Sequence, residues 1–327
     1  MEVLMNRRNI LKAPAAAFAT LSFSITPLMA EDWQPRRPIN VIVPYGAGGG
    51  VDTYARSFAT GLQEQLGVPI VIVNKPGSGG LVGSAEAAAA RPDGQTMLLA
   101  AAGGILLGSM FKDAPVDPFD SFDTVAQIGN LVFAIAVPAD SPYQTAADLV
   151  AAAKANPDGL RWAHGGRGSA THVPGQSLLD LNSLAATDVP FKGGAKIRAA
   201  IIGRQVDFGI LGIQQSFGFD NELRVLGVFS ADRYPLAPDV PTFDEQGIEN
   251  GNIGSPVTLF APLGTPAEAI ATVSKALSSV TGADAFAEAM APKGLTAAYA
   301  DGPDADATLL AIKEGAQPVI DALKAAK

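Results

Sequence analysis

The 327-residue sequence contains no cysteine and only two histidines, His164 and His172. The lack of cysteine excludes disulfide bonds, thiolate metal ligands and thiol catalysis. With two histidines a multi-histidine metal site is unexpected, and we predict neither a metal nor a cofactor. Basic residues are also scarce, with 23 Lys and Arg against 32 Asp and Glu and a net charge of −9. Because no basic surface could release counterions from phosphates, we predict no nucleic-acid partner.

The sequence also lacks a run that would clearly span a membrane. Arg7 and Arg8 precede an apolar segment from Ala13 to about Ala30, which contains two prolines and is short for a membrane helix. The arginine pair resembles a twin-arginine export signal, and a general secretory signal is the alternative. We expect cleavage near Ala30 and a mature protein in the periplasm, without a lipid anchor because no cysteine could carry one. That mature chain has 20 basic and 31 acidic residues, a net charge of −11.

Glycine and proline, by contrast, are plentiful, with 35 and 24 residues. The first apolar strand pattern, Ile39–Pro44, ends in the glycine-rich turn Gly46–Gly50, and a helical pattern follows over Thr53–Leu66. Strands that alternate with helices in this way favour an α/β fold with mostly parallel sheets flanked by helices. In such sheets ligands bind at the carboxyl ends of the strands, where these turns lie.

Three further glycine-rich turns follow predicted strands: Asn74–Gly80, Gly165–His172 and Lys192–Gly194. Glycines let a ligand approach the backbone closely, and the first N–H groups of a helix point outward without partners. Together these features bind anions. We therefore predict that the turns hold a small anion, and that the protein is a carrier and not an enzyme.

A sequence pattern that occurs twice predicts two similarly built lobes. Phe133–Ala155 and Thr258–Ser278 each suggest a strand, a Pro-x-x-Ser/Thr-Pro turn and a helix. We predict a division into an export signal (residues 1–30), a first lobe (31–130 plus 254–327) and a second lobe (131–253). The four glycine turns would then face one another across a cleft between the lobes.

Two other kinds of site are disfavoured by the same turns. Gly46-Ala47-Gly48 begins a dinucleotide-binding motif, but Val51 replaces its last glycine, and Asn74 stands where an acid would bind the ribose. Ser169 and His172 would suit a hydrolase, yet the serine does not lie in a G-x-S-x-G motif. A hydrolase therefore remains only an alternative.

Taken together, the motifs resemble the substrate-binding proteins of tripartite tricarboxylate transporters, also called Bug receptors. The resemblance spans nearly all of the mature chain and rests on eight pieces in order: 42–52, 74–80, 91–94, 168–172, 189–194, 203–207, 237–242 and 259–266. It implies a two-lobed type II periplasmic-binding-protein fold. It also implies a monomeric receptor that captures a small carboxylate and delivers it to membrane permease subunits. A carboxylate sensor that serves a signalling partner is the alternative function.

Strand-end positions and the resemblance together predict the ligand-binding residues. These are Tyr45, Ala47, Gly48, Gly49, Asp52, Ser78, Gly79, Ala101, Ser169, Thr171, His172, Phe191, Lys192, Gly193 and Gln214. Four of them have a second interpretation. Tyr45 and Phe191 end strands and are equally plausible as core residues or as pocket walls. Asp52 suits the first turn of a helix and could pair with Arg56 without touching a ligand. Lys192 could attract an anion or simply be solvated.

Overall fold

The computed structural model describes residues 33–111, 114, 116–250 and 254–325, so the expected export signal lies outside the described residues. Its strands are β1 (Ile39–Val43), β2 (Ile70–Asn74), β3 (Thr96–Ala101), β4 (Phe122–Leu131), β5 (Phe133–Pro138), β6 (Arg161–His164), β7 (Thr187–Pro190), β8 (Phe208–Gly212), β9 (Leu223–Val228), β10 (Ser255–Pro262) and β11 (Ala297–Asp301). Its α-helices are α1 (Gly50–Leu66), α2 (Leu81–Ala88), α3 (Ala102–Phe111), α4 (Pro118–Ser121), α5 (Ala146–Ala155), α6 (His172–Leu181), α7 (Gly194–Ile202), α8 (Ala267–Thr281), α9 (Asp284–Met290) and α10 (Gly302–Ala325). Short 3₁₀ helices are η1 (Ser78–Gly80), η2 (Ile213–Gln215), η3 (Asp244–Gln246) and η4 (Ala291–Lys293).

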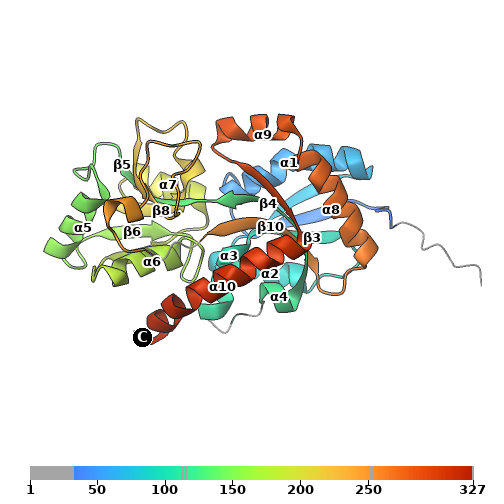
Figure 1. Cartoon of the computed structure of the whole chain (residues 1–327), viewed down its shortest axis with the longest axis horizontal. Coiled ribbons are helices and arrows are strands. Elements are labelled where there is room, and N and C mark those ends of the chain that lie inside the picture. The colour runs from blue at the N-terminus through green and yellow to red at the C-terminus, as the bar shows by residue number, and fades with distance from the viewer. Residues whose placement is uncertain (1–32, 112–113, 115, 251–253, 326–327) are drawn as a thin grey trace, which may run out of the picture. The chain divides into compact units, whose positions relative to one another are not determined.

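The strands form two sheets, which Figure 1 shows side by side within one compact unit that begins at Trp33. One sheet has the order β11-β4-β10-β3-β1-β2, and the other has the order β7-β6-β8-β5-β9. The predicted two-lobed α/β architecture is confirmed. The sheets are mixed, however: β1 pairs in parallel with β2 and β3, whereas β10 runs antiparallel to both β3 and β4. The residue boundaries of the lobes stay a prediction.

The central strands β3 and β10 of the six-stranded sheet are buried on both faces, which explains why they are mostly apolar. Alternate residues of β3 pack on opposite sides: Met97 and Leu99 lie with α1 and α8, while Leu98 and Ala100 lie with α2, α3 and α10. In the five-stranded sheet, Trp162 of β6 packs toward α6, and its neighbour Ala163 packs toward α7. Both sheets therefore place their strand ends, and not their faces, within reach of a ligand.

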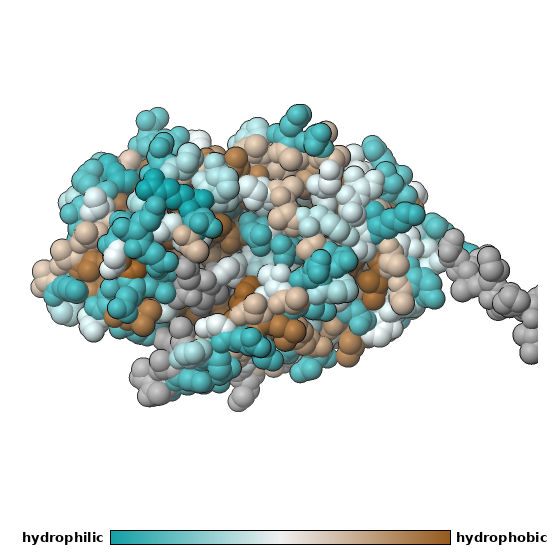
Figure 2. Space-filling model, viewed as in Figure 1, coloured by the Kyte–Doolittle hydropathy of each residue, from teal (hydrophilic) through white to brown (hydrophobic). Residues whose placement is uncertain are grey.

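The surface around these cores is mixed in character. On the face shown in Figure 2, most of the surface is hydrophilic or intermediate, and hydrophobic residues gather in smaller patches. Among the described residues, none of the helices combines the length and apolar character that crossing a membrane requires.

The apolar pattern Thr96–Ala101 predicts a third strand that ends in a glycine turn; the strand is present as β3, but the turn is wrong. We expected β3 to end in a turn at Gly103 and Gly104, whereas both lie in a helix that begins at Ala102. Close packing explains why both positions are glycine. A Cβ on Gly103 would lie 2.7 Å from the Gly254 carbonyl oxygen, and one on Gly104 would lie 2.7 Å from Ala170 Cβ. Gly104 therefore allows α3 to approach Ala170, which follows β6 of the other sheet, and Gly103 allows it to pack against the start of β10.

Candidate functional site

The predicted glycine turns of the two sheets meet. A Cβ on Gly46, after β1, would lie only 2.6 Å from the Lys192 carbonyl oxygen, after β7. A Cβ on Gly79 would lie 3.1 Å from Ser169 Cβ. Gln215 of η2 also donates a hydrogen bond from Nε2 to the Gly48 carbonyl oxygen at 3.4 Å. The two sheets are therefore closed upon each other at their strand ends.

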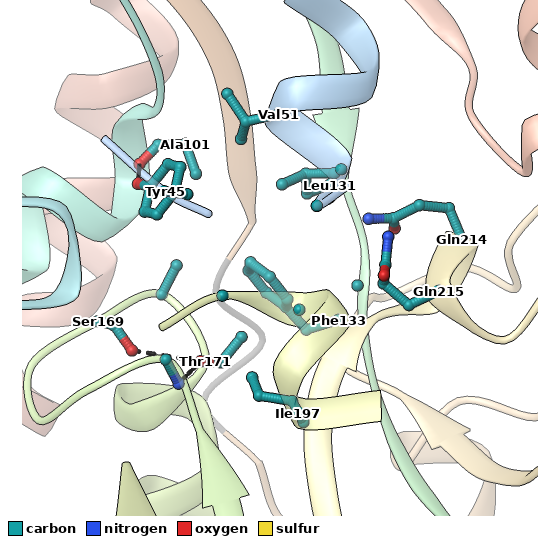
Figure 3. A pocket seen from close by; sticks show the side chains of 17 residues that line it. Tyr45, Val51, Ala101, Leu131, Phe133, Ser169, Thr171, Ile197, Gln214 and Gln215 are labelled. Atoms are coloured by element: carbon teal, nitrogen blue, oxygen red, sulfur yellow. Dashed lines mark hydrogen bonds between the residues drawn. The ribbon is translucent and has the colours of Figure 1, made fainter. Parts of the chain in front are cut away.

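Between these contacts lies a cavity of about 70 Å³, which we call the interlobe pocket (Figure 3). Its lining comes from the strand ends and helix starts of both sheets: Tyr45, Gly49, Gly50, Val51, Ala101, Leu131, Phe133, Gly165, Ser169, Ala170, Thr171, Gly193, Gly194, Ile197, Gly212, Gln214 and Gln215. Seven predicted site residues are among them: Tyr45, Gly49, Ala101, Ser169, Thr171, Gly193 and Gln214.

Three helices begin at the wall of the interlobe pocket. Gly49 precedes α1, Thr171 precedes α6 and Gly193 precedes α7, and none of the three gives its helix a side-chain cap. The first N–H groups of α1 and α7 are therefore available to a ligand, and the helix dipoles favour negative charge there, whereas the first two N–H groups of α6 are bonded to Ser169 and its third residue is Pro174. Gly193 has φ 112°, a conformation that L side chains rarely adopt, so glycine is required where α7 begins.

Among the described residues of the lining there is no Asp, Glu, Lys, Arg or His. Its hydroxyl groups are arranged to donate. Gly165 N–H donates to Thr171 Oγ1 at 2.7 Å, His172 N–H donates to Ser169 Oγ at 3.3 Å, and the two hydroxyl oxygens are 3.2 Å apart. Because both oxygens already accept a backbone N–H and one hydroxyl proton serves their mutual bond, the second proton can be donated to a ligand.

Two glutamines lie on the opposite side of the pocket from Ser169 and Thr171, with Phe133 between the two sides (Figure 3). Arg198 Nη1 donates to Gln215 Oε1 at 3.1 Å, and its guanidinium lies 4.1 Å from the ring centroid of Phe219. This contact fixes the carbonyl end of Gln215 on Arg198 and leaves the amide end for donation. Gln214 is 92% buried in the lining and makes no side-chain hydrogen bond with the described residues.

The rest of the wall is apolar, and sequence reasoning missed it. Val51, Leu131, Phe133 and Ile197 line the pocket beside the polar groups. Each belongs to a helix or strand pattern, or lies between two strands, where an apolar residue normally indicates core. The signal that could have found three of them is position, because Val51 follows the first glycine turn, and Leu131 and Phe133 flank the crossing between the sheets.

A second cavity, about 410 Å³ in volume, lies beside the interlobe pocket and shares Tyr45, Gly165 and Gly193 with it. We call it the rim groove. Four predicted site residues line it and not the pocket: Ser78, Gly79, Phe191 and Lys192. Lys192 is exposed there.

The remaining four predicted residues, Ala47, Gly48, Asp52 and His172, line neither cavity. Asp52 is 2% exposed and accepts hydrogen bonds from Gly48 N–H at 2.8 Å, Arg56 Nε at 3.0 Å and Asn74 Nδ2 at 2.9 Å. Burial raises the pKa of this carboxyl, but these donors outweigh it and bring the pKa below its ordinary value. Asp52 thus stays ionised and fixes the first turn, as the helix-start interpretation expects.

A polar cluster forms where the end of β6 meets β7. His164 Nε2 is 3.0 Å from Asp188 Oδ2, and Gly166 N–H donates to His164 Nδ1 at 3.0 Å. Arg167 donates to both oxygens of Asp188, which holds the pKa of that carboxyl well below its usual range despite partial burial. Burial lowers the pKa of His164, although Asp188 opposes this, so His164 is neutral with its proton on Nε2.

This cluster is a poor metal site. The ligand atoms of His164, His172 and Asp188 lie within 4.8 Å of one another. The backbone N–H of Gly166 occupies Nδ1 of His164 and forces the proton onto Nε2, the nitrogen that faces Asp188. A guanidinium on Asp188 would also repel a cation. The cluster therefore suits support of the 164–172 segment better than metal binding.

The geometry also weakens the hydrolase alternative. His172 donates a hydrogen bond to Ser169 Oγ from its backbone N–H, at 3.3 Å. The His172 ring packs on Trp162, with centroids 5.7 Å apart, and edge-on against His164 at 4.7 Å. This aromatic packing accounts for the burial of His172 without a role as a general base.

Residues 54–323 match the sequence profile of the tripartite tricarboxylate transporter family receptor. A relative from Pseudomonas sp. (strain P51), the UPF0065 protein in the tcbD-tcbE intergenic region, is 30% identical over 297 residues, which cover 90% of this chain and 88% of that protein.

Solved structures show the same similarity. The periplasmic binding protein BugD is 29% identical, with a TM-score of 0.80 over 89% of this chain and 98% of its own. MatC from Rhodopseudomonas palustris, solved with bound malate, is 25% identical, with a TM-score of 0.78 over 88% and 99% of the two chains. A second R. palustris protein, solved with adipate, is also 25% identical, with a TM-score of 0.81 over 88% and 97%.

Proposed function

Because this chain belongs to the tripartite tricarboxylate transporter receptor family, we propose that it is a periplasmic receptor that binds one small carboxylate in the interlobe pocket. The observation that carries the proposal is the convergence of two helix starts with unbonded N–H groups, those of α1 and α7, on a pocket whose described lining has no charged side chain. Such a site compensates one negative charge with backbone N–H groups and hydroxyls, as anion sites at helix N-termini do.

The relatives support the ligand class. Two proteins with the same fold were solved with malate and with adipate, both carboxylates. The proposal extends to a monomeric receptor that closes on its ligand and delivers it to membrane permease subunits. It also includes export by the N-terminal signal and cleavage near Ala30. The contacts between the two sheets support closure. A ligand that touches both sheets shifts the equilibrium toward the closed conformation.

The test is a thermal-shift screen of mono-, di- and aromatic carboxylates, followed by a search for reaction products. A receptor is stabilised by its ligand and returns it unchanged. At a free ligand concentration 100 times Kd, the free energy of unfolding should rise by about 2.7 kcal/mol. Failure of every carboxylate to raise the melting temperature, or release of product from a bound ester, would contradict the proposal.

A further inference from the structure

We propose that the rim groove is the mouth through which a carboxylate enters the interlobe pocket, and that Lys192 draws the anion to this mouth. This inference rests on the proposed function and adds the route by which its ligand arrives. Lys192 then speeds the association of the ligand and takes no part in holding it once it is bound.

The groove lies on the side of the pocket away from the places where the chain crosses between the two sheets. The chain crosses at Val132, between β4 of one sheet and β5 of the other, and returns between β9 and β10. Leu131 and Phe133, which flank the first crossing, line the pocket but not the groove. The groove is lined instead by segments at the ends of β1, β2, β6 and β7, which lie at the sheet edges away from β4 and β5. Two lobes that turn about their crossings separate at this side, so the groove is where the pocket opens to solvent.

The groove and the pocket form one path, because Tyr45, Gly165 and Gly193 line both. Where the two walls of the groove meet, a Cβ on Gly46 would lie only 2.6 Å from the Lys192 carbonyl oxygen. Lys192 therefore stands at the point where the mouth closes, one residue before Gly193, the residue that precedes α7. An anion that passes Lys192 next meets the first N–H groups of α7.

The charge of Lys192 is not balanced within the groove. The described residues of the groove include two cations, Arg167 and Lys192, and no Asp or Glu. Arg167 is balanced by Asp188, to which it donates two hydrogen bonds at 2.8 and 2.7 Å. Lys192 is exposed, and its ammonium makes no hydrogen bond or ion pair with the described part of the chain. The groove is thus a positive site on a chain whose net charge is −9. Such a site concentrates anions where they enter.

Exposure explains why Lys192 should attract the ligand without holding it. An ion pair that stays in water contributes little to affinity, whereas attraction over a distance acts before contact and speeds association. Lys192 does not line the interlobe pocket, so the bound ligand lies beyond its reach. A change of charge at this position should therefore alter the association rate constant and leave the dissociation rate constant unchanged.

The chain contains no cysteine, so one introduced thiol can change this charge in both directions. In Lys192→Cys, aminoethyl methanethiosulfonate restores an ammonium, and sulfonatoethyl methanethiosulfonate introduces a negative charge. Lys154→Cys, treated in the same way, is the control for net charge, because Lys154 is exposed on α5, which lines neither cavity. The probes are acetate, succinate, malate, adipate and benzoate. Stopped-flow fluorescence of Trp162, whose ring stacks on His172, follows both rate constants.

The salt concentration sets the size of the expected effect. At an ionic strength of about 0.01 M, where charges act over about 30 Å, an acid that binds should associate about threefold faster with the ammonium adduct of Lys192→Cys than with the sulfonate adduct. The two adducts of Lys154→Cys should differ less than about 1.5-fold. At about 1 M salt, where this range falls to about 3 Å, the difference at Lys192 should vanish.

The wild-type protein provides a measurement that needs no variant. The net charge alone predicts that an anion is repelled and that added salt speeds its association. If the positive mouth controls entry, added salt should instead slow the association of the anion. Faster association at high salt would contradict the inference.

The outcomes separate the inference from the proposed function. If the two adducts of Lys192→Cys associate at the same rate, or if those of Lys154→Cys differ as much, Lys192 does not draw the ligand and the carboxylate receptor stands. A charge effect confined to the dissociation rate constant would mean that Lys192 holds the bound ligand, and it would overturn the inference in the same way. If none of the five acids binds, both proposals are wrong.

Discussion

The side chain on which the pocket depends most directly is Ser169. It is 5% exposed, lies in the lining and shares a hydroxyl proton with Thr171 3.2 Å away. The Ser169→Ala variant removes one donor to the bound carboxylate, and hydrogen bonds to charged groups contribute about 1.5–3 kcal/mol. We expect Kd to rise about tenfold or more in calorimetry. Ser279→Ala, at an exposed position of α8, is the control, and equal affinities in both variants would exclude a role for this hydroxyl.

Stability should fall as the solution is acidified, in two ranges. Burial lowers the pKa of His164, so below about pH 6.5 the unfolded chain takes up a proton there that the folded chain refuses. The pKa values of Asp52 and Asp188 are also lowered, so a further loss begins near pH 4, where the unfolded carboxyls protonate first. Urea unfolding at several pH values measures both.

A variant isolates the histidine contribution. His164→Asn keeps an acceptor for Gly166 N–H but cannot titrate, so the unfolding free energy should change less between pH 7 and pH 5. An unchanged slope would mean that His164 does not contribute to the acid sensitivity.

At the residue scale, the sequence predicted polar groups of the pocket better than its walls. Ser169 and Gln214 were found because they follow strands, and strand ends carry ligand-binding groups. Phe133 and Ile197 were not found, since an apolar side chain that lines a pocket has the same local pattern as one in a core. Gln215 was also missed, because its role depends on Arg198, a contact that only the fold creates.

Among the elements, α1 has a strict sequence requirement at its start, because its first residue, Gly50, has no room for a side chain. A Cβ on Gly50 would collide with Gln214 Nε2 and lie 2.9 Å from Leu131 Cδ2. Gly50→Ala should therefore displace Gln214 and weaken carboxylate binding about tenfold, while higher helix propensity partly offsets the cost to folding. Calorimetry and thermal unfolding of the same sample separate the two effects.

The matched control for Gly50→Ala lies in α10. Gly315 is a helical glycine with nothing within 4 Å of an added Cβ. Gly315→Ala should raise the free energy of unfolding by up to about 1 kcal/mol and leave binding unchanged. If both variants bind the ligand like the wild type, the start of α1 does not shape the pocket.

Helix and strand boundaries could be predicted from the sequence where nearby residues determine them. Gly67 ends α1 in the left-handed conformation, with φ 70°, as a glycine after a helical pattern suggests. Prediction failed for α3, where Gly103 and Gly104 serve contacts with distant residues rather than a turn. The antiparallel pairing of β10 with β3 and β4 could not be foreseen either, because pairing between strands so far apart in the chain leaves no local signal.

On the scale of the whole molecule, a ligand in the interlobe pocket should stabilise both sheets together. The two tryptophans report on different sheets: Trp33 lies beside Gly94 and Ala269 of α8, and Trp162 is buried in β6. In the single-tryptophan variants Trp33→Phe and Trp162→Phe, a bound carboxylate should raise the fluorescence melting temperature by the same amount. A shift confined to one probe would place the ligand on one lobe alone.

The most direct test of the account is a comparison between an anion and its neutral analogue. The strongest carboxylate from the screen and its primary amide would be titrated into the protein by calorimetry at pH 7.5. Since the pocket compensates a negative charge with helix N-termini and no cationic side chain, we predict 1:1 binding of the acid and an affinity at least tenfold lower for the amide. Equal affinities would contradict the anion site, and the absence of binding by every acid would contradict the receptor.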